Sequence, residues 1–422
     1  MNRGIPFKDT FLYWLKLGFI SFGGPTGQIA MMHKEIVENK KWMDEDQFLH
    51  ALNFCMFLPG PEAQQLATYI GWTLNSTRGA LAAGVLFVLP SVFILWGLSW
   101  IYAAFGTIPA VSALFYGLKP AVAAIVAEAV IRIGKKSLKT GTLVVLASLS
   151  FIAIYFLNIP FPVIIVSAGI IGYLFNRRLS GQGEPLKGAV SESVHDSTSS
   201  GWGRTIRIAT FGLLLWFSPM ILIGLWLGWD SILVNIGVLF SKAAVVTFGG
   251  AYAVLGYIGQ QAVNHYGWLT QEQMMDGLAL AETTPGPLIM VNQFVAYVAA
   301  YLHTQGLTPA VAGAVGGVVA TWVTFVPSTL WIFIGAPYIE SLRRKVRLSS
   351  ALTAITAAVV GVVLNLAVNF TRHTLLPETG GFQWYALAAS IISFVGMTKF
   401  KWGMIPVIIG SALAGYIWKQ IL

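Results

Sequence analysis

The sequence contains few of the residues on which soluble enzymes and secreted domains depend. Cys55 is the single cysteine among 422 residues, so the chain can form neither an internal disulfide nor a paired-thiol zinc site. No phosphate-binding lysine loop, His-Glu metal motif or serine–histidine arrangement stands out along the chain. We therefore expect no metal, no cofactor and no enzyme activity.

Charge is also scarce, because Asp, Glu, Lys and Arg make up only 10% of the residues. The net charge of +9 would suit a nucleic-acid partner, but there is no folded polar domain to present a basic face. Hydrophobic residues reach 56% and mean hydropathy is +0.71, far from the composition of soluble domains. The chain is predicted to lie in a lipid bilayer and to bind no nucleic acid.

Long apolar stretches follow one another along the chain, and each approaches the roughly 20 residues that a helix needs to span a bilayer. We predict an all-α polytopic membrane protein with about thirteen hydrophobic segments. The segments are Phe11–Met32, Ala51–Leu74, Gly79–Phe105, Ile108–Ile133, Thr142–Leu157, Ile159–Phe175, Ile206–Gly228, Ile232–Ile258, Met275–Leu302, Val311–Ile339, Ala351–Phe370, Phe382–Val395 and Met404–Trp418. The amino-terminal residues show no cleavage pattern, and we expect no removable signal peptide.

Two helix-breaking motifs occur twice. Phe-Gly-Gly occupies 22–24 and 248–250, Pro-Gly-Pro occupies 59–61 and 285–287, and each second copy lies 226 residues after the first. At the same offset the chain also repeats Lys16 as Lys242, Trp42 as Trp268 and Gln47 as Gln273. Such polar and aromatic matches are rare by chance in an apolar chain, so we infer two homologous halves whose helices are broken at corresponding places.

The boundaries of these halves follow from composition. We assign residues 1–175 to the first half, 176–205 to a polar cytoplasmic linker, 206–230 to an extra connecting transmembrane helix and 231–422 to the second half. Basic residues cluster near 132–139, 177–207 and 343–347, and we place all three clusters in the cytoplasm. The extra helix then inverts the second half, with the amino terminus inside and the carboxyl terminus outside. This count assumes that the second Pro-Gly-Pro segment crosses the membrane, although the sequence leaves open whether these segments span or re-enter.

The helix breaks are the predicted substrate site. Each Pro-Gly-Pro can start a half-helix whose free N–H groups and positive dipole end suit an anion, and glycine lets a ligand approach the backbone. The alternative is that the breaks are packing kinks without a ligand, as we expect for Gly84 elsewhere in the chain. The candidate substrate-binding residues are Lys16, Gly23, Gly24, Gly60, Gln64, Gln65, Lys119, Lys242, Gly249, Gly250, Thr283, Thr284, Gly286, Asn292 and Gln293.

Charged residues inside apolar segments are costly and indicate function by default. Lys119 and Lys242 lie deep in their segments, whereas Lys16 could reach the surface. The candidate coupling or gating residues are Glu62, Glu128, Arg132 and Glu282. Glu62 and Glu282 flank the two breaks, where protonation could accompany anion binding or the carboxylates could simply cap helices. Glu128 and Arg132, four residues apart, suit a structural ion pair better than a proton relay.

The chain resembles the chromate ion transporter (CHR) family in its long, two-domain form. The residues that carry the resemblance are Ser21-Phe22-Gly23-Gly24-Pro25, Leu58-Pro59-Gly60-Pro61-Glu62-Ala63-Gln64-Gln65, Gly117-Leu118-Lys119-Pro120 and Phe248-Gly249-Gly250-Ala251-Tyr252. Together they are specific, and the resemblance covers nearly the whole chain. Pro25 corresponds to Ala251, and Gln64-Gln65 to Met290-Val291, so the halves are not expected to contact substrate symmetrically.

The resemblance implies a multi-pass carrier of the bacterial inner membrane that exports chromate and confers chromate resistance, with sulfate as the expected competitor. A carrier of another inorganic or organic anion with the same fold is the alternative, followed by an anion channel. A membrane-bound chromate reductase is disfavoured because one cysteine and no cofactor motif provide no electron carrier. A homodimer is left open.

Overall fold

The fold consists of helices and their connections. The computed structural model describes residues 4–175, 202–248, 250–335, 346–377 and 380–421, and these ranges contain no strand. Among them six helices are long and apolar enough to cross a membrane, and further apolar helices are shorter. The prediction of an all-α polytopic membrane protein is confirmed. Most of the predicted linker, Gly249 and the basic residues at 343–345 lie outside the described residues.

The helices of the first half are α1 (Phe7–Ile20), α2 (Gly24–His33), η1 (Lys34–Asn39), α3 (Glu45–Cys55), α4 (Glu62–Phe105), α5 (Pro109–Ser137), α6 (Gly141–Tyr155) and α7 (Phe161–Leu174). A single helix, α9 (Trp202–Leu227), follows. The later helices are α10 (Ile232–Val246), α11 (Ala251–Gly259), η2 (Gln260–His265), α12 (Gln271–Thr283), η3 (Leu288–Met290), α13 (Val291–Leu302), α14 (Pro309–Gly335), α16 (Val346–Leu375), α17 (Trp384–Thr398) and α18 (Met404–Ile421). The elements thus recur in the same order on either side of α9. The π-helical turn η1 follows α2, and the π-helical turn η2 follows α11 at the corresponding place.

Local sequence explains where these helices begin. Asp44 and Thr270 occupy matching positions before α3 and α12, and each forms a capping box with the glutamine three residues later. Proline stands in the first turn of α2, α5 and α7, where its missing N–H is not needed.

Helix α4 folds back on itself at its middle instead of continuing in one direction. Within α4 the backbone leaves helical geometry at Asn75 and Ser76, and a Cβ on Gly71 would lie 2.3 Å from the carbonyl oxygen of Gly79. Residues eight apart in a straight helix lie about 12 Å apart, so α4 is a hairpin of two arms, 62–74 and 77–105.

Helical hairpins also form at the duplicated motifs. The rings of Tyr13 and Trp42 lie 5.6 Å apart across the Phe-Gly-Gly turn, and those of Phe54 and Tyr69 lie 5.6 Å apart across Pro-Gly-Pro. In the second half, a Cβ on Gly277 would meet the ring of Phe294 at 2.2 Å. The chain therefore reverses at each Pro-Gly-Pro. The orientation count from the sequence assumed that the second Pro-Gly-Pro segment crosses, a point that the sequence left open; in the structure α12 and α13 are antiparallel arms, so that assumption does not hold.

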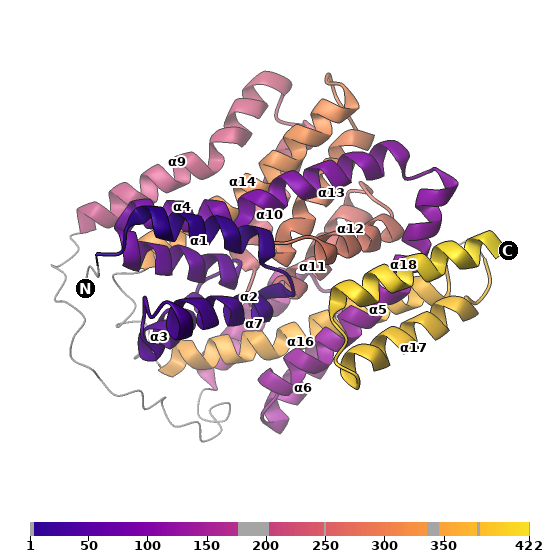
Figure 1. The fold of residues 1–422 in the computed structure, drawn as a ribbon, viewed down its shortest axis with the longest axis horizontal. Coiled ribbons are helices and arrows are strands. Elements are labelled where there is room, and N and C mark those ends of the chain that lie inside the picture. Colours follow the sequence, from indigo (N-terminus) through magenta and orange to yellow (C-terminus); the bar gives the residue numbers. More distant parts are fainter. Residues whose placement is uncertain (1–3, 176–201, 249, 336–345, 378–379, 422) are drawn as a thin grey trace.

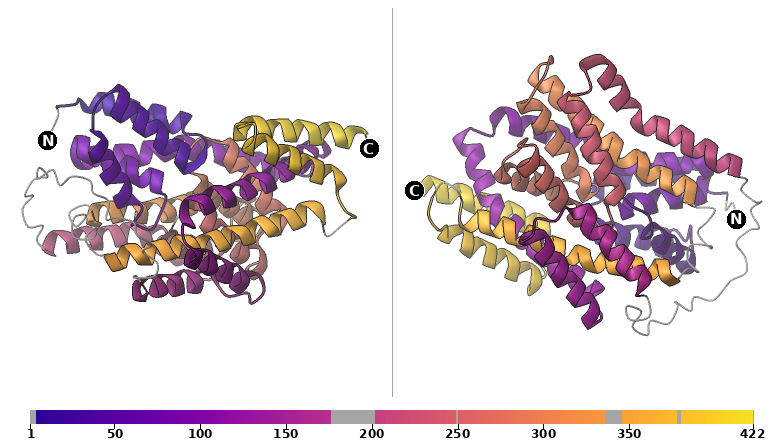
Figure 2. Two further views of the ribbon diagram at one scale, coloured as in Figure 1. Left: turned by 90° about the horizontal axis from the view of Figure 1, so that it is seen from below. Right: turned by 180° about the vertical axis from the view of Figure 1, so that it is seen from behind.

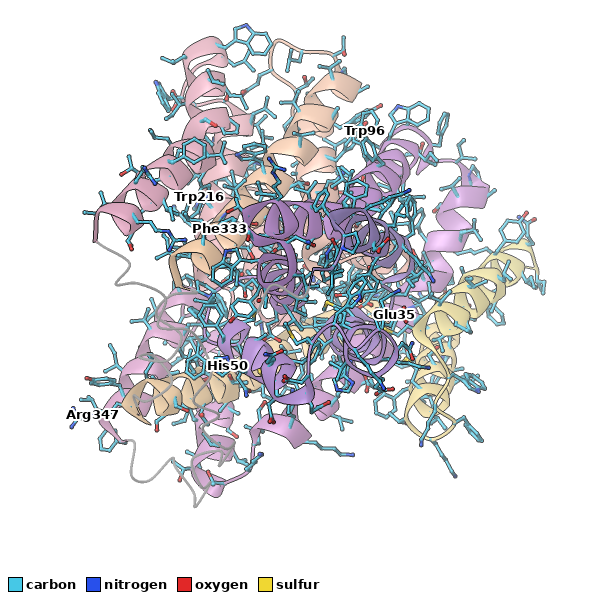
Figure 3. All side chains as sticks on the ribbon, turned by 60° about the vertical axis from the view of Figure 1, so that its left-hand side comes forward. Glu35, His50, Trp96, Trp216, Phe333 and Arg347 are labelled. Carbon is cyan, nitrogen blue, oxygen red and sulfur yellow. The ribbon has the colours of Figure 1, made fainter. Side chains whose placement is uncertain are left out.

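The last two helices of each half pack against a long helix of the other half. Helices α17 and α18 pack on α5, whereas α6 and α7 pack on α16, as Figures 1 and 2 show. Small residues allow these close contacts, since a Cβ on Gly415 would lie 2.2 Å from Cα of Gly117. The buried core runs through both halves, and Arg347 at the start of α16 stands at the periphery (Figure 3).

The fold-back of α4 gives a first prediction. Gly79→Leu is expected to reduce the amount of folded protein several-fold, because a Cβ at this position would lie 2.1 Å from the carbonyl oxygen of Gly71. Fluorescence-detected size-exclusion chromatography of the detergent-extracted protein measures this amount. Gly97→Leu is the control, since a Cβ there meets nothing within 4 Å, and equal recovery of the two variants would contradict the hairpin.

Candidate functional site

The four motif turns meet in two pairs, and each pair joins the two halves. The amide of Gly60, in the first Pro-Gly-Pro, donates to the carbonyl of Thr247 at 2.9 Å. The amide of Gly286, in the second Pro-Gly-Pro, donates to the carbonyl of Ser21, also at 2.9 Å. Thr247 and Ser21 each precede a Phe-Gly-Gly. We call these contacts the crossed junctions: the Gly60 junction and the Gly286 junction.

Each junction also touches a helix of the other half that contains an internal proline. A Cβ on Gly286 would lie 2.6 Å from Cβ of Ser91 in α4, and one on Gly60 would lie 3.1 Å from Oγ of Ser328 in α14. Both glycines have positive φ, 105° and 130°, where a side chain is strained. Ser91 and Ser328 directly follow Pro90 and Pro327 inside their helices. Glycine is thus required at both junctions by conformation, and at Gly286 also by space.

Amide side chains surround the Gly60 junction. The hydroxyl of Ser328 donates to Oε1 of Gln64 at 2.7 Å, and Nε2 of Gln64 donates to Oγ1 of Thr329 at 3.2 Å. Gln65 turns back and donates from Nε2 to the carbonyl of Pro59 at 2.8 Å. Both glutamines are buried. The structure therefore brings the predicted residues Gly60, Gln64 and Gln65 together.

A second set of amides surrounds the Gly286 junction. Nε2 of Gln28 donates to the carbonyls of Gly286 at 2.6 Å and of Ser21 at 3.0 Å. Gln293 donates to the carbonyl of Val92 at 2.8 Å, again joining the halves. Asn292 is buried and donates to Oγ1 of Thr324 at 3.3 Å. The predicted residues Gly286, Asn292 and Gln293 thus lie on the α13 side of this junction.

Polar atoms without partners remain in this region. Among the described residues, Oε1 of Gln28, Oε1 of Gln65, Oγ of Ser91 and Oδ1 of Asn292 are buried and make no hydrogen bond. Unpartnered buried polar atoms are costly and rare in folded proteins. These four atoms belong to the helices that flank or touch the crossed junctions, and six further atoms of this kind in the described part of the chain lie on Tyr13, Trp14, Arg132, Gln260, Asp276 and Trp331. The surroundings of the junctions thus contain unpartnered polar atoms within an apolar protein.

In the described part of the chain, the other predicted binding residues make no side-chain hydrogen bond at the junctions. Lys16 and Lys242 are exposed on α1 and α10, and the structure does not bring their side chains to the junctions. Thr283 and Thr284 donate their hydroxyls to carbonyls three residues earlier in α12, so these protons point back into the helix. Gly23, Gly24 and Gly250 form the Phe-Gly-Gly turns with positive φ, and Gly249 lies outside the described residues.

Three of the predicted coupling residues, Glu128, Arg132 and Glu282, lie near one another, and Glu62 is in a separate setting. Glu282 is buried and accepts a hydrogen bond from the hydroxyl of Tyr252. Arg132 pairs with Glu128 at 3.3 Å, and both charges lie close enough to act on Glu282. Glu62 is partly buried at the start of α4, where Lys136 acts on it. Whether any of these groups moves a proton stays a prediction.

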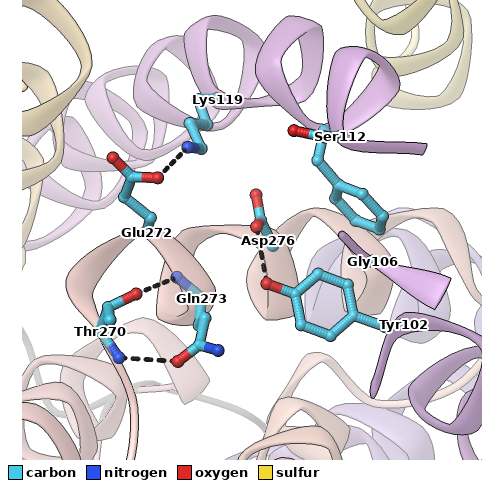
Figure 4. A pocket seen from close by; sticks show the side chains of 9 residues that line it. Tyr102, Gly106, Ser112, Lys119, Thr270, Glu272, Gln273 and Asp276 are labelled. Atoms are coloured by element: carbon cyan, nitrogen blue, oxygen red, sulfur yellow. Dashed lines mark hydrogen bonds and ion pairs between the residues drawn. The ribbon is translucent and has the colours of Figure 1, made fainter. Parts of the chain in front are cut away.

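Lys119 forms an ion pair that the sequence did not indicate. Its Nζ lies 2.6 Å from Oε2 of Glu272, across the boundary between the halves, at a cavity of about 190 Å³ (Figure 4). Asp276 and Tyr102 line the same cavity. Lys119 therefore belongs to a separate place from the crossed junctions.

Sequence reasoning missed Gln28, Ser91, Ser328 and Asp276. The two serines had a visible signal, because Pro-Ser recurs at 90–91 and 327–328 within apolar stretches. A proline inside a helix leaves a carbonyl free and permits a close approach by a neighbouring backbone. Gln28 and Asp276 have no polar counterpart of the same kind in the other half, where Val254 and His50 stand, so the repeat did not reveal them.

The chemical capacity of the junctions follows from their geometry. The amides of Gly60 and Gly286 are neutral donors at the starts of the half-helices that begin with Glu62 and Leu288. Helix starts favour anions, and neutral donors hold an anion without cancelling its charge. Here both amides bond to carbonyls of the opposite half, so an anion would have to replace a carbonyl. Among the described residues, no group of His, Cys, Asp and Glu could hold a metal ion.

The sequence is similar to those of known proteins over almost the whole chain. The chain is 28% identical over 417 residues to a chromate transport protein of Cupriavidus metallidurans, covering 98% of this chain and 94% of the relative. It is 28% identical over 418 residues to a chromate transport protein of Pseudomonas aeruginosa, with 97% and 92% covered. An uncharacterized transporter of Methanocaldococcus jannaschii is 29% identical over 409 residues, with 97% and 94% covered.

No solved structure matches the chain. The sequence profile described as chromate transporter matches residues 8–173 and 234–416, one segment on each side of α9. Both matched segments contain a Phe-Gly-Gly and a Pro-Gly-Pro, the turns that build the crossed junctions. The resemblance drawn from the sequence is confirmed: this multi-pass membrane protein belongs to the chromate transporter family.

Proposed function

We propose that this protein is a secondary carrier that exports chromate and related oxyanions, and that the crossed junctions hold the anion during transport. The observation that carries the proposal is the pairing of each Pro-Gly-Pro amide with a carbonyl of the other half, at 2.9 Å in both junctions. The names of the Cupriavidus and Pseudomonas relatives support chromate as the substrate. Sulfate, also a tetrahedral dianion, is the proposed competitor.

The proposed cycle exchanges one hydrogen bond for another. Separation of the halves at a junction frees the amide of Gly60 or of Gly286, and an oxyanion accepts that N–H in place of the carbonyl. Side-chain donors beside the junctions, such as the hydroxyl of Ser91, can add to the binding. Reclosure then returns each amide to its carbonyl and releases the anion. Because the described residues place no lysine side chain at the junctions, release does not require an ion pair to break there.

We also propose an inverted arrangement of the halves, with hairpins that re-enter on the side from which they start. Only α9 and α14 then cross between the end of α5 and the start of α16, an even number, so their basic ends share one side. Arg347, at the start of α16, lies 5.7 Å from the ring of Tyr173 near the end of α7, which supports a common basic side. With that side in the cytoplasm, the amino terminus is inside and the carboxyl terminus outside.

Export is the direction that the membrane potential favours. Moving a dianion through 100 mV changes its free energy by about 4.6 kcal/mol, which corresponds to roughly three decades in concentration ratio. A cell with a negative interior therefore drives chromate outward, whereas uptake would require compensating cations. The proposed location is the inner membrane of a bacterial-type cell. A homodimer stays a prediction, since each chain already contains both halves.

Transport into inverted membrane vesicles tests the proposed function. Radiolabelled chromate is expected to accumulate when an interior-positive potential is imposed, to saturate with concentration, and to be inhibited by excess sulfate. Vesicles without the protein are the control. Saturation by sulfate, molybdate or an organic anion with no chromate uptake would favour another anion carrier. A current far above one substrate per conformational cycle would favour a channel.

A further inference from the structure

A polar cavity lies between the halves, away from the crossed junctions. It has a volume of about 190 Å³ and lies where α4 ends, α5 begins and α12 begins (Figure 4). The first half contributes Tyr102, Ser112, Phe115 and Lys119, and the second half contributes Thr270, Glu272, Gln273 and Asp276. A movement between α5 and α12 would therefore reshape this cavity.

Asp276 is the central group of the cavity. Its side chain is 5% exposed, and Oδ2 accepts a hydrogen bond of 2.9 Å from the hydroxyl of Tyr102. Oδ1 has no hydrogen-bond partner among the described residues. Figure 4 shows the carboxylate between Tyr102 and Lys119. A buried carboxylate with one bare oxygen is costly, and binding of a proton to that oxygen removes the cost.

The charges around the cavity select the kind of ligand. Glu272 and Asp276 provide two carboxylates against the single ammonium of Lys119, so a dianion would be repelled. A hard metal cation takes about six oxygen ligands. Here Thr270 and Gln273 are occupied by each other in a capping box, and the ammonium of Lys119 competes with any cation. A proton requires only one oxygen, and Oδ1 of Asp276 provides it.

The acidic pair of this cavity is not repeated in the sequence of the other half. Positions 226 residues before Glu272 and Asp276 hold Asp46 and His50, so a base stands where the buried acid would be. The crossed junctions are duplicated, but the carboxylate is single. This asymmetry suits a group that adds one coupled ion to a transport cycle built on two similar halves.

We propose that this cavity is a proton-binding site that couples proton movement to the anion transport proposed above, on which this inference rests. Oδ1 of Asp276 takes one proton from water on the side of the membrane that the cavity faces. When the halves move, it releases this proton to water on the opposite side of the membrane. Lys119 controls the exchange: close to Asp276 it favours the carboxylate, and its departure with α5 favours the protonated acid. In the proposed orientation the cavity faces outward, so protons enter as chromate leaves.

The groups that interact with the Asp276 carboxyl group, through a hydrogen bond or through their charge, come from three helices. They are Tyr102 of α4, Lys119 of α5 and Glu272 of α12 itself. Helices α13, α16 and α18 also pack on α12, and α16 carries Arg372 and His373 next to Thr374, whose hydroxyl lies 3.9 Å from Sδ of Met275. Neither side chain makes a hydrogen bond or an ion pair with Asp276 among the described contacts. Lys119 is thus the only cation in the set, and its 2.6 Å contact with Glu272 crosses the boundary between the halves.

The test uses the full chain in proteoliposomes with the potential clamped and an internal pH-sensitive dye. For one proton per chromate, a gradient of one pH unit is expected to shift the equilibrium chromate ratio about tenfold in the wild type. Asp276→Asn is expected to abolish this shift while still responding to an imposed potential. Asp46→Asn, the exposed counterpart of Glu272, is the matched control and should keep the shift.

A second variant keeps the test decisive if Asp276→Asn does not fold. Tyr102→Phe removes the donor that stabilises the carboxylate, so the pH midpoint of transport should move upward. The inference is overturned by an undiminished shift in Asp276→Asn, by a midpoint in Tyr102→Phe equal to wild type, or by a shift that follows a sodium gradient instead. Loss of the shift in Glu62→Gln but not in Asp276→Asn would also overturn it. Wild-type liposomes that move no chromate would instead reject the proposed function.

Discussion

Gly286→Ala is expected to lower chromate transport at least tenfold while the protein remains in the membrane. The new Cβ would lie 2.6 Å from Cβ and 2.8 Å from Oγ of Ser91, in a backbone with φ of 105°. Such a conformation costs a non-glycine residue about 1–3 kcal/mol, and 1.4 kcal/mol already corresponds to a factor of ten. Initial chromate uptake by inverted vesicles, divided by the amount of protein in the membrane, measures the effect.

A rescue separates crowding at the junction from general damage. Ser91→Gly removes the atoms that the new Cβ would meet. The double variant Gly286→Ala, Ser91→Gly should therefore regain the activity lost to crowding, but not the activity lost to the strained φ angle. Gly60→Ala should have a smaller effect than Gly286→Ala, because its nearest neighbour, Nε2 of Gln65 at 2.9 Å, is the end of a flexible side chain. Wild-type transport by Gly286→Ala would show that the close contact with Ser91 has no part in transport.

Gly84 is not a neutral glycine to compare with Gly286. The sequence suggests that Gly84 serves helix packing alone, but a Cβ there would lie 2.7 Å from Oγ1 of Thr68 and 3.1 Å from Nε2 of Gln64. Gly84 therefore belongs to the surroundings of the Gly60 junction and is not neutral. Gly97 is the better control, because a Cβ there meets nothing within 4 Å and alanine is the better helix former.

Gln64→Leu is expected to reduce transport at least tenfold and to lower the free energy of unfolding by about 2–4 kcal/mol. Gln64 accepts from Ser328 at 2.7 Å and donates to Thr329 at 3.2 Å, so it joins α4 to α14 across the two halves. Leucine of similar size leaves both hydroxyls without this partner in a buried place. Thermal unfolding of the purified protein and chromate uptake by vesicles measure the two effects.

Gln420→Leu is the matched control, since Gln420 is exposed near the end of α18. Gln64→Glu adds a sharper comparison: it keeps an acceptor for Ser328 but introduces a carboxylate beside the proposed anion site, so uptake should fall as far as in Gln64→Leu. Transport by Gln64→Leu equal to that of Gln420→Leu would remove Gln64 from the account.

The positions of the helix breaks were predictable because proline and glycine act locally. A missing N–H or a positive φ interrupts a helix whatever surrounds it, so the motifs at 22–24, 59–61 and their repeats gave the turns correctly. The break at Asn75 and Ser76 was also visible, because the polar residues 75–78 separate the predicted segments Ala51–Leu74 and Gly79–Phe105. The sequence did not show that the first arm belongs to a hairpin, because the length of an apolar stretch does not distinguish one crossing from a hairpin.

Contacts between the halves lay beyond the reach of the sequence. The pairing of Gly60 with Thr247, and of Lys119 with Glu272, depends on how the two halves fit together, and no local pattern encodes it. Lys16 and Lys242 show the converse. Their match across the repeat suggested a shared role at the breaks, yet both side chains are exposed on α1 and α10. Repetition identifies equivalent positions but not which surface they face.

Binding measured apart from transport tests the central claim most directly. Equilibrium dialysis of the purified protein with radiolabelled chromate reports whether the junctions hold the anion. The account predicts saturable binding by the wild type and by Gly97→Ala, displacement by sulfate, and at least tenfold weaker binding by both Gly60→Ala and Gly286→Ala. Chromate binding by those two folded variants with wild-type affinity would contradict it.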